Sequence, residues 1–131
     1  MKELVWVMVG SALGGAARFW LSGVVGRHVG ETFPWGTMAV NVTGCLVIGA
    51  LGAIALNGPG WFREPAAGPV AFVGFLGCYT TVSSFSLQTL MLARDGEMLR
   101  AAGNVVLSVV LCLAAVALGY AAGTGLGPVL R

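Results

Sequence analysis

The sequence predicts an all-α membrane protein with four transmembrane helices, and three observations lead to this fold class. Of the 131 residues, 57% are hydrophobic and only 9% are charged, whereas soluble domains carry about 25% charged residues. Three windows, residues 32–62, 65–93 and 101–130, contain no Asp, Glu, Lys or Arg. Each window is longer than the roughly 20 residues that cross the hydrocarbon core. Four spans with short connections leave no room for a soluble domain, so we expect a single multi-pass domain in the cell membrane.

The first predicted span covers residues 4–25 and is interrupted only by Arg18. Lys2 followed by an apolar run is also typical of a signal peptide. The run continues past Arg18 to Leu21 without a convincing cleavage motif. We therefore expect a helix that stays in the membrane.

The other predicted spans lie in the charge-free windows, at residues 36–56, 68–92 and 101–124. We expect the third span to be broken near its middle, at residues 77–81, because glycine with hydroxyl and β-branched residues weakens a helix. Backbone carbonyls freed by such a break can coordinate a cation such as Na⁺ when protein surrounds them. Indole rings favour the membrane interface, and the four tryptophans fall near predicted span ends: Trp6 and Trp61 on one side, Trp20 and Trp35 on the other.

Small residues within the spans predict close helix packing. Gly10 and Gly14 are four residues apart, as are Gly119 and Gly123, a spacing that lets helix backbones approach each other. We interpret them as contacts within one chain, with a contact between two copies as the alternative. The cysteines, which are Cys45, Cys78 and Cys112, lie within spans without metal-site spacing and are interpreted as small packing residues.

Positive charges are distributed evenly over the two membrane sides. Lys2, Arg63 and Arg131 lie on the side of the N-terminus, whereas Arg27, Arg94 and Arg100 lie on the opposite side. Orientation in a membrane follows an excess of Lys and Arg on one side. Without that excess the chain is expected to insert in both orientations, which allows two copies to pair antiparallel. The net charge of +2 is too small and scattered to indicate a nucleic-acid partner.

Three of the spans each carry a stripe of polar residues on one helical face. One stripe alone is explained by hydrogen bonds between helices. Three stripes without a carboxylate in any span favour a path for a small species that accepts hydrogen bonds, because amides and hydroxyls can donate them. The stripes are Thr37, Asn41, Gly44 and Cys45; Thr81, Ser84, Phe85 and Gln88; and Asn104, Ser108 and Cys112.

Arg18 and Phe85 extend this hypothesis to an anion. Arg18 is the only charge within a span; it either snorkels to the interface or attracts anions at the mouth of a pore. The edge of an aromatic ring carries partial positive charge, so Phe85 could present C–H groups to an anion.

Three sequence pieces are similar to the CrcB/Fluc family of fluoride channels. They are Gly-Gly-Ala-Ala-Arg at residues 14–18, Gly-Thr-Met-Ala-Val-Asn at 36–41, and Gly-Phe-Leu-Gly-Cys-Tyr-Thr-Thr-Val-Ser-Ser-Phe-Ser at 74–86. The third piece is long enough to be quite specific. The resemblance implies a dual-topology antiparallel homodimer in the lipid bilayer, with two fluoride pores and a structural Na⁺ at its centre.

The resemblance also implies roles for individual residues. Asn41 would be a pore-lining amide and Phe85 one ring of an aromatic pair that contacts fluoride, while the backbone carbonyls of Gly77 and Thr80 would hold the Na⁺. Arg18 would lie at the vestibule. The complete set of expected pore residues is Thr37, Asn41, Val82, Ser83, Ser84, Phe85, Gln88 and Ser108.

The sequence departs from the family pattern at several of these positions. Val82 replaces the first aromatic residue of the pair. Either the pore tolerates an aliphatic wall opposite Phe85, or a heteromeric paralogue supplies the missing ring; the balanced charges favour the homodimer. The other departures are Cys78 for Gly, Gln88 for Glu, Asn104 for Tyr and Cys112 for Ser.

The function expected from the sequence is passive, fluoride-selective export across the cell membrane, without enzymatic chemistry. One alternative is a small multidrug-resistance-type transporter, another antiparallel four-span dimer. That mechanism requires a membrane carboxylate, and no predicted span contains one. The second alternative is a non-transporting membrane assembly subunit, whose polar stripes would contact a partner protein.

Overall fold

The computed structural model describes residues 2–30, 32–57 and 67–126, and all regular secondary structure in these ranges is helical. The helices are α1 (Lys2–Val29), α2 (Trp35–Asn57), α3 (Ala67–Tyr79), α4 (Val82–Arg94) and α5 (Met98–Leu126). Four stretches are long and apolar enough to cross a membrane: Lys2–Val29, Trp35–Asn57, Val70–Arg94 and Met98–Gly125. The predicted four-span fold is therefore confirmed, and the protein is a multi-pass membrane protein. Three residues used above to assign membrane sides, Trp61, Arg63 and Arg131, lie outside the described ranges.

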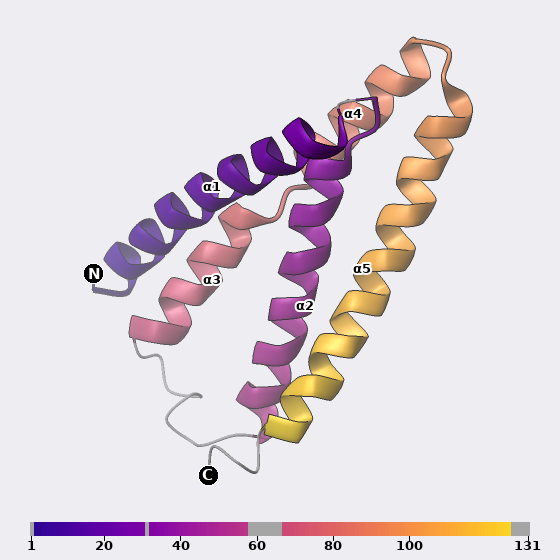
Figure 1. Ribbon diagram of the computed structural model, residues 1–131. Coiled ribbons are helices and arrows are strands. Elements are labelled where there is room, and N and C mark those ends of the chain that lie inside the picture. Colours follow the sequence, from indigo (N-terminus) through magenta and orange to yellow (C-terminus); the bar gives the residue numbers. More distant parts are fainter. Residues whose placement is uncertain (1, 31, 58–66, 127–131) are drawn as a thin grey trace.

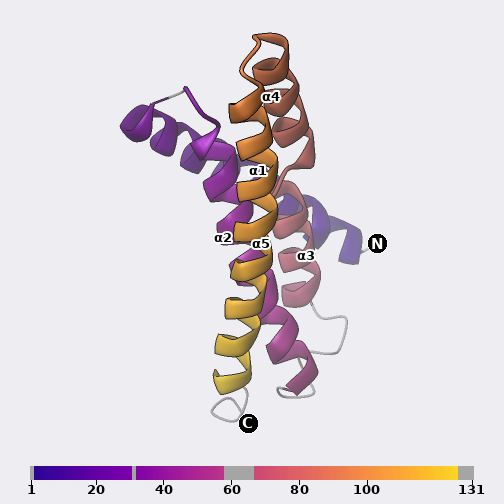
Figure 2. The ribbon, with the colours of Figure 1, turned by 90° about the vertical axis from the view of Figure 1, so that its right-hand side faces the viewer.

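The helices form two closely packed pairs, α1 with α3 and α2 with α5. Figures 1 and 2 show α2 and α5 side by side in both views, with α1 crossing obliquely near the start of α2. The contacts of Gly119 with Leu46 and of Gly123 with Ala50 advance by four residues on both helices, so α2 and α5 run in the same direction. This parallel register fixes which α2 residues face which α5 residues.

The glycines with four-residue spacing lie where helix backbones approach most closely. A Cβ atom built on Gly14 would lie 2.1 Å from the carbonyl oxygen of Phe75, and one on Gly119 would lie 2.0 Å from that of Leu46. Real Cβ atoms do not approach a backbone atom this closely, so only glycine fits. These contacts are within the chain, which confirms the first of the two interpretations of the glycine spacing.

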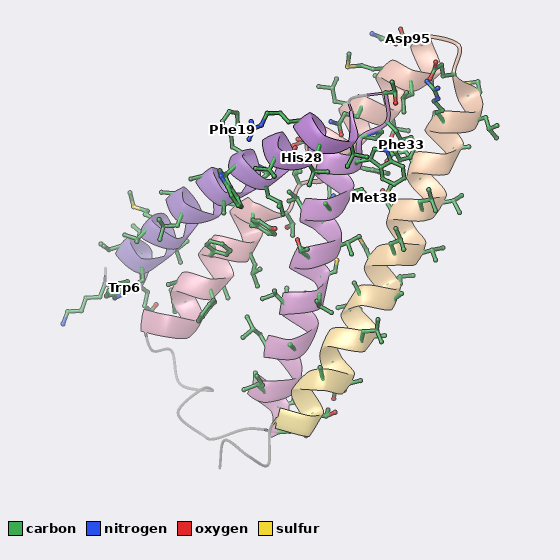
Figure 3. The ribbon with its side chains drawn as sticks, viewed as in Figure 1. Trp6, Phe19, His28, Phe33, Met38 and Asp95 are labelled. Atoms are coloured by element: carbon green, nitrogen blue, oxygen red, sulfur yellow. The ribbon has the colours of Figure 1, made fainter. Side chains whose placement is uncertain are left out.

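The outer surface of the described bundle is largely apolar, as lipid requires. Figure 3 shows Phe19 pointing away from the other helices, with 84% of its surface exposed, whereas Met38 is buried between α2 and α5. Trp6 and Trp35 are partly exposed near helix ends, which agrees with their predicted interfacial positions. Trp20 is also exposed, but it lies well before the end of α1 at Val29.

The third span is broken between α3 and α4, at the end of the segment where the sequence predicts a break. Thr81 is extended, with φ −151° and ψ 122°, and caps α4 by accepting a hydrogen bond from the backbone N–H of Ser84. Threonine is a favoured N-cap residue because its hydroxyl accepts a hydrogen bond from a first-turn N–H group that has no carbonyl partner within the helix. The break therefore places a polar backbone segment in the middle of a membrane span.

Candidate functional site

Asn41 on α2 binds directly to the backbone at the helix break. Its side-chain Nδ2 donates to the Thr81 carbonyl over 2.9 Å, and its Oδ1 accepts from the Thr81 N–H over 2.8 Å. One amide group thus binds both the N–H and the carbonyl of the extended residue at the helix break. Asparagine carries two N–H donors, and the bond to Thr81 uses only one of them.

Because of these contacts, two backbone carbonyls lack the N–H donors that they would have in a continuous helix. In a continuous helix the N–H groups of Thr81 and Ser84 would bind the carbonyls of Gly77 and Thr80. Here the Thr81 N–H binds Asn41 and the Ser84 N–H binds the Thr81 hydroxyl. The carbonyls of Gly77 and Thr80, the two residues expected to hold Na⁺, are thus among those that the break leaves without their helical donors. Oxygen ligands of this kind suit a hard cation, so the residues fit the expected ion.

Hydroxyl groups extend the polar contacts on the α4 side of the break. The Thr81 Oγ1 lies 3.1 Å from the Ser83 Oγ and donates to the Ser84 Oγ over 3.2 Å. We call Asn41, Thr81, Ser83 and Ser84 the junction cluster. It joins α2 to the start of α4 without a charged group.

Arg18 lines a cavity of about 350 Å³ beside the junction cluster. Thr37, Thr81 and Ser84 line the same cavity, which we call the vestibule cavity. In the described part of the chain no carboxylate pairs with Arg18. Its uncompensated positive charge makes the vestibule cavity favourable for an anion. The complete lining is Gly15, Arg18, Phe19, Ser22, Gly23, Thr37, Val40, Thr81 and Ser84.

A larger groove of about 700 Å³ runs along α2, α3 and the start of α4. Its wall is mainly apolar, but Asn41, Gly77, Thr80 and Thr81 all contribute to it. Thr81 lines both the groove and the vestibule cavity. The junction cluster therefore lies between the two spaces.

A second polar group lies farther along α4 and α5. Asn104, which is 2% exposed, donates through Nδ2 to the Thr89 Oγ1 over 2.8 Å. The Thr89 hydroxyl in turn donates to the Phe85 carbonyl over 2.7 Å, and the Ser108 Oγ lies 3.5 Å from the Asn104 Oδ1. Nearby on α4, the buried Oε1 of Gln88 has no hydrogen-bond partner among the described residues.

The structure brings some of the predicted pore residues together and separates others. Thr37, Asn41 and Ser84 surround Thr81, with Arg18 at the vestibule cavity. Ser108 belongs instead to the α4–α5 group, and Val82, 75% exposed, faces the open groove. Phe85 is half-buried and lies outside the linings of both spaces, as does Gln88.

Sequence reasoning missed Thr89 and Thr43. Thr89 orients Asn104, and the Thr43 Oγ1 lies 2.8 Å from the Tyr79 hydroxyl just before the helix break. Thr43 lies two residues after Asn41 and Thr89 one residue after Gln88, so neither falls on a predicted stripe. A search for hydroxyls within one turn of the predicted amides would have found both.

The fold and site define a small multi-pass membrane protein in which uncharged polar groups meet at a broken helix. Residues 5–120 match the family described as "CrcB-like protein, Camphor Resistance (CrcB)", and the chain belongs to this family. It is 63% identical over 122 residues to a protein of Rhodopseudomonas palustris named fluoride-specific ion channel FluC 2, covering 93% of both chains.

Two further relatives carry the same kind of name. A second fluoride-specific ion channel FluC 2, from Bradyrhizobium diazoefficiens, is 57% identical over 97% of this chain and 93% of its own. The fluoride-specific ion channel FluC of Methylocella silvestris is 50% identical over 90% of each chain. Ion channels catalyse no covalent reaction, so the family supports the expectation that this protein is not an enzyme.

Proposed function

We propose that this protein is a passive ion channel that exports fluoride across the cell membrane. The observation that carries this proposal is that Thr81, bound by the Asn41 amide, lines both the vestibule cavity and the groove. Uncharged donors line this route, and Arg18 is the only charged residue in the linings. A route of this chemistry suits a small anion, and the names of the relatives identify that anion as fluoride.

Asn41 acts on fluoride by replacing part of its hydration shell. The amide keeps one N–H that the bond to Thr81 does not use. Because both ends of the amide are held by Thr81, that remaining donor has a fixed direction. The Ser84 hydroxyl, which lines the vestibule cavity, supplies a further partner, and Arg18 raises the local concentration of anions at the entrance. Ser83, Phe85 and Ser108 line neither space within one chain and stay expected pore residues.

The functional unit in this proposal is an antiparallel homodimer with two pores. The groove is walled by α2, α3, the start of α4 and Cys112 of α5, and it is open on its other side, where Val82 is 75% exposed. A second copy in the opposite orientation would complete the wall. The balance of three positive charges against three at the span ends supports insertion in both orientations.

In the dimer the carbonyls of Gly77 and Thr80 would hold a structural Na⁺. Both residues line the groove, and both have lost the amide donor that a continuous helix would supply. Two such carbonyls from each copy would give an oxygen cage on the two-fold axis. The bound ion would supply the positive charge that holds the two broken helices together.

The two alternatives are less well supported. A proton-coupled drug transporter needs a carboxylate at membrane depth. In the part of the chain that the structure describes, Glu3, Asp95 and Glu97 lie at helix ends. A non-transporting assembly subunit would need a different partner protein, and stable purification as a two-chain particle would argue against it.

Fluoride efflux from liposomes tests the proposal directly. Vesicles containing the purified protein and loaded with fluoride should release it when an ionophore supplies a counter-ion current. Vesicles loaded with chloride should release it at the rate of protein-free vesicles. Equal release of both halides would contradict fluoride selectivity, and no release of either would contradict the channel.

Position 82 offers a second test of the route. Val82→Phe should raise the fluoride rate about threefold, because a ring edge offers partial positive charge that an isopropyl group lacks. Val106→Phe on α5 is the control: Val106 is 58% exposed and outside both linings. An unchanged rate in Val82→Phe, with assembly intact, would show that position 82 does not line the path.

A further inference from the structure

Two cysteines that are far apart in sequence lie next to each other between α2 and α5. A Cβ atom on Gly49 would lie 2.3 Å from the Val116 carbonyl oxygen. Cys45 is four residues before Gly49 and Cys112 is four residues before Val116. Since the helices run in the same direction, one turn back along each brings the two cysteines together. The two side chains also line the same groove, on the same side of the contact between α2 and α5.

Both thiols are chemically accessible. Cys45 and Cys112 are reduced and half-buried, and both line the groove. Cys45 lies one turn beyond Asn41, and Cys112 one turn beyond Ser108. A species that reaches Asn41 through the groove therefore also reaches the thiol pair.

The surroundings restrict which metal ion two thiols could hold. Among the described residues no third His, Cys, Asp or Glu joins the pair, so the site cannot satisfy Zn²⁺, which takes four ligands. Thiolates prefer soft ions, and a soft ion that accepts two ligands in a line needs only this pair. A net charge is costly at membrane depth. Two thiolates neutralise a divalent ion but leave a univalent one with a net negative charge.

We infer that Cys45 and Cys112 form a binding site for a soft divalent metal ion with two-coordinate geometry, of which Hg²⁺ is the example. The reaction is an exchange: two S–H bonds break, two S–Hg bonds form, and two protons pass to water. Nothing is oxidised or reduced. The product is neutral, so it fits the uncharged wall of the groove.

Intact-chain mass spectrometry of the purified protein after treatment with mercuric chloride tests this site. The treated protein is washed with an excess of a small monothiol before denaturation. A metal held by two thiols of one chain should survive the wash, because the second thiol acts at a high effective concentration. The wild type should therefore show the mass of one chain plus one mercury minus two protons.

The three cysteines provide matched variants. Cys78→Ser should retain mercury like the wild type, because Cys78 lies on α3 outside the groove lining. Cys45→Ser and Cys112→Ser should each reduce the retained mercury about tenfold or more, since each leaves a single thiol in the groove, with Cys78 outside its lining. Retention in either of these variants at the wild-type level would overturn the inference. So would a wild type that retains none, or two chains bridged by one mercury. The readout does not involve fluoride, so it fails or succeeds independently of the proposed channel function.

Discussion

Asn41→Asp is expected to lower the fluoride efflux rate at least about 100-fold, which corresponds to roughly 2.7 kcal/mol in the barrier. Two effects act in the same direction. A carboxylate has no N–H, so both amide donors of Asn41 are lost. The negative charge of the carboxylate also repels fluoride. In the linings of the groove and the vestibule cavity, Arg18 is the only positive charge that could offset it. The assay is liposome efflux at about pH 8, where a carboxyl group ionises.

Asn57→Asp is the matched control for this substitution. Asn57 lies at the end of the same helix, where its Nδ2 donates to the Ala53 carbonyl. Asn57→Asp makes the same chemical change at a position outside the groove and the vestibule cavity. The efflux rate of this variant should therefore stay close to that of the wild type. Both variants should elute as the wild-type particle. An Asn41→Asp protein that elutes normally and conducts like the wild type would remove Asn41 from the anion path.

The sequence predicts the spans and the helix break well because both depend on local chemistry. Charge-free windows of sufficient length must cross the membrane. Glycine and hydroxyl residues at 77–81 weaken the helix there, and Thr81 caps the helix that follows. These features require no knowledge of the neighbouring helices.

The contacts between helices are less predictable from the sequence. Periodicity places Asn41 on a polar face, but it does not reveal that the amide binds the backbone of Thr81, which is 40 residues away. The pairing of Cys45 with Cys112 likewise depends on the register of α2 against α5. That register is set by glycine contacts such as Gly49 with Val116, and a shift of one residue would separate the thiols.

The polar stripes on the three spans also do not form one continuous surface within a single chain. Asn104 and Ser108 bind to each other, and Asn104 binds Thr89, whereas Asn41 binds at the break. One face of a helix is wide enough to contact two neighbouring helices. Residues of one polar stripe therefore bind to different helices. In the proposed dimer, the second copy would decide which of these groups face the same water-filled space.

Gly119→Ala is expected to destabilise the protein by about 1–3 kcal/mol or more, because it forces a methyl group into a closely packed contact. The added Cβ would lie 2.0 Å from the Leu46 carbonyl oxygen and 3.1 Å from the Ala50 backbone nitrogen. These are backbone atoms of α2, so no side chain can rotate away and the two helices must separate. The measurement is the thermal unfolding midpoint of the purified protein in detergent.

The same helix contains the control, Gly103→Ala. A Cβ atom at Gly103 meets nothing within 4 Å, and alanine favours a helix over glycine by up to about 1 kcal/mol. Gly103→Ala should therefore leave the midpoint unchanged or raise it, while Gly119→Ala lowers it. Equal midpoints for the two variants would mean that α5 can move away from α2 at little cost. In that case the register that brings Cys45 to Cys112 would not be fixed by the glycine contacts, and the thiol pair would need another explanation.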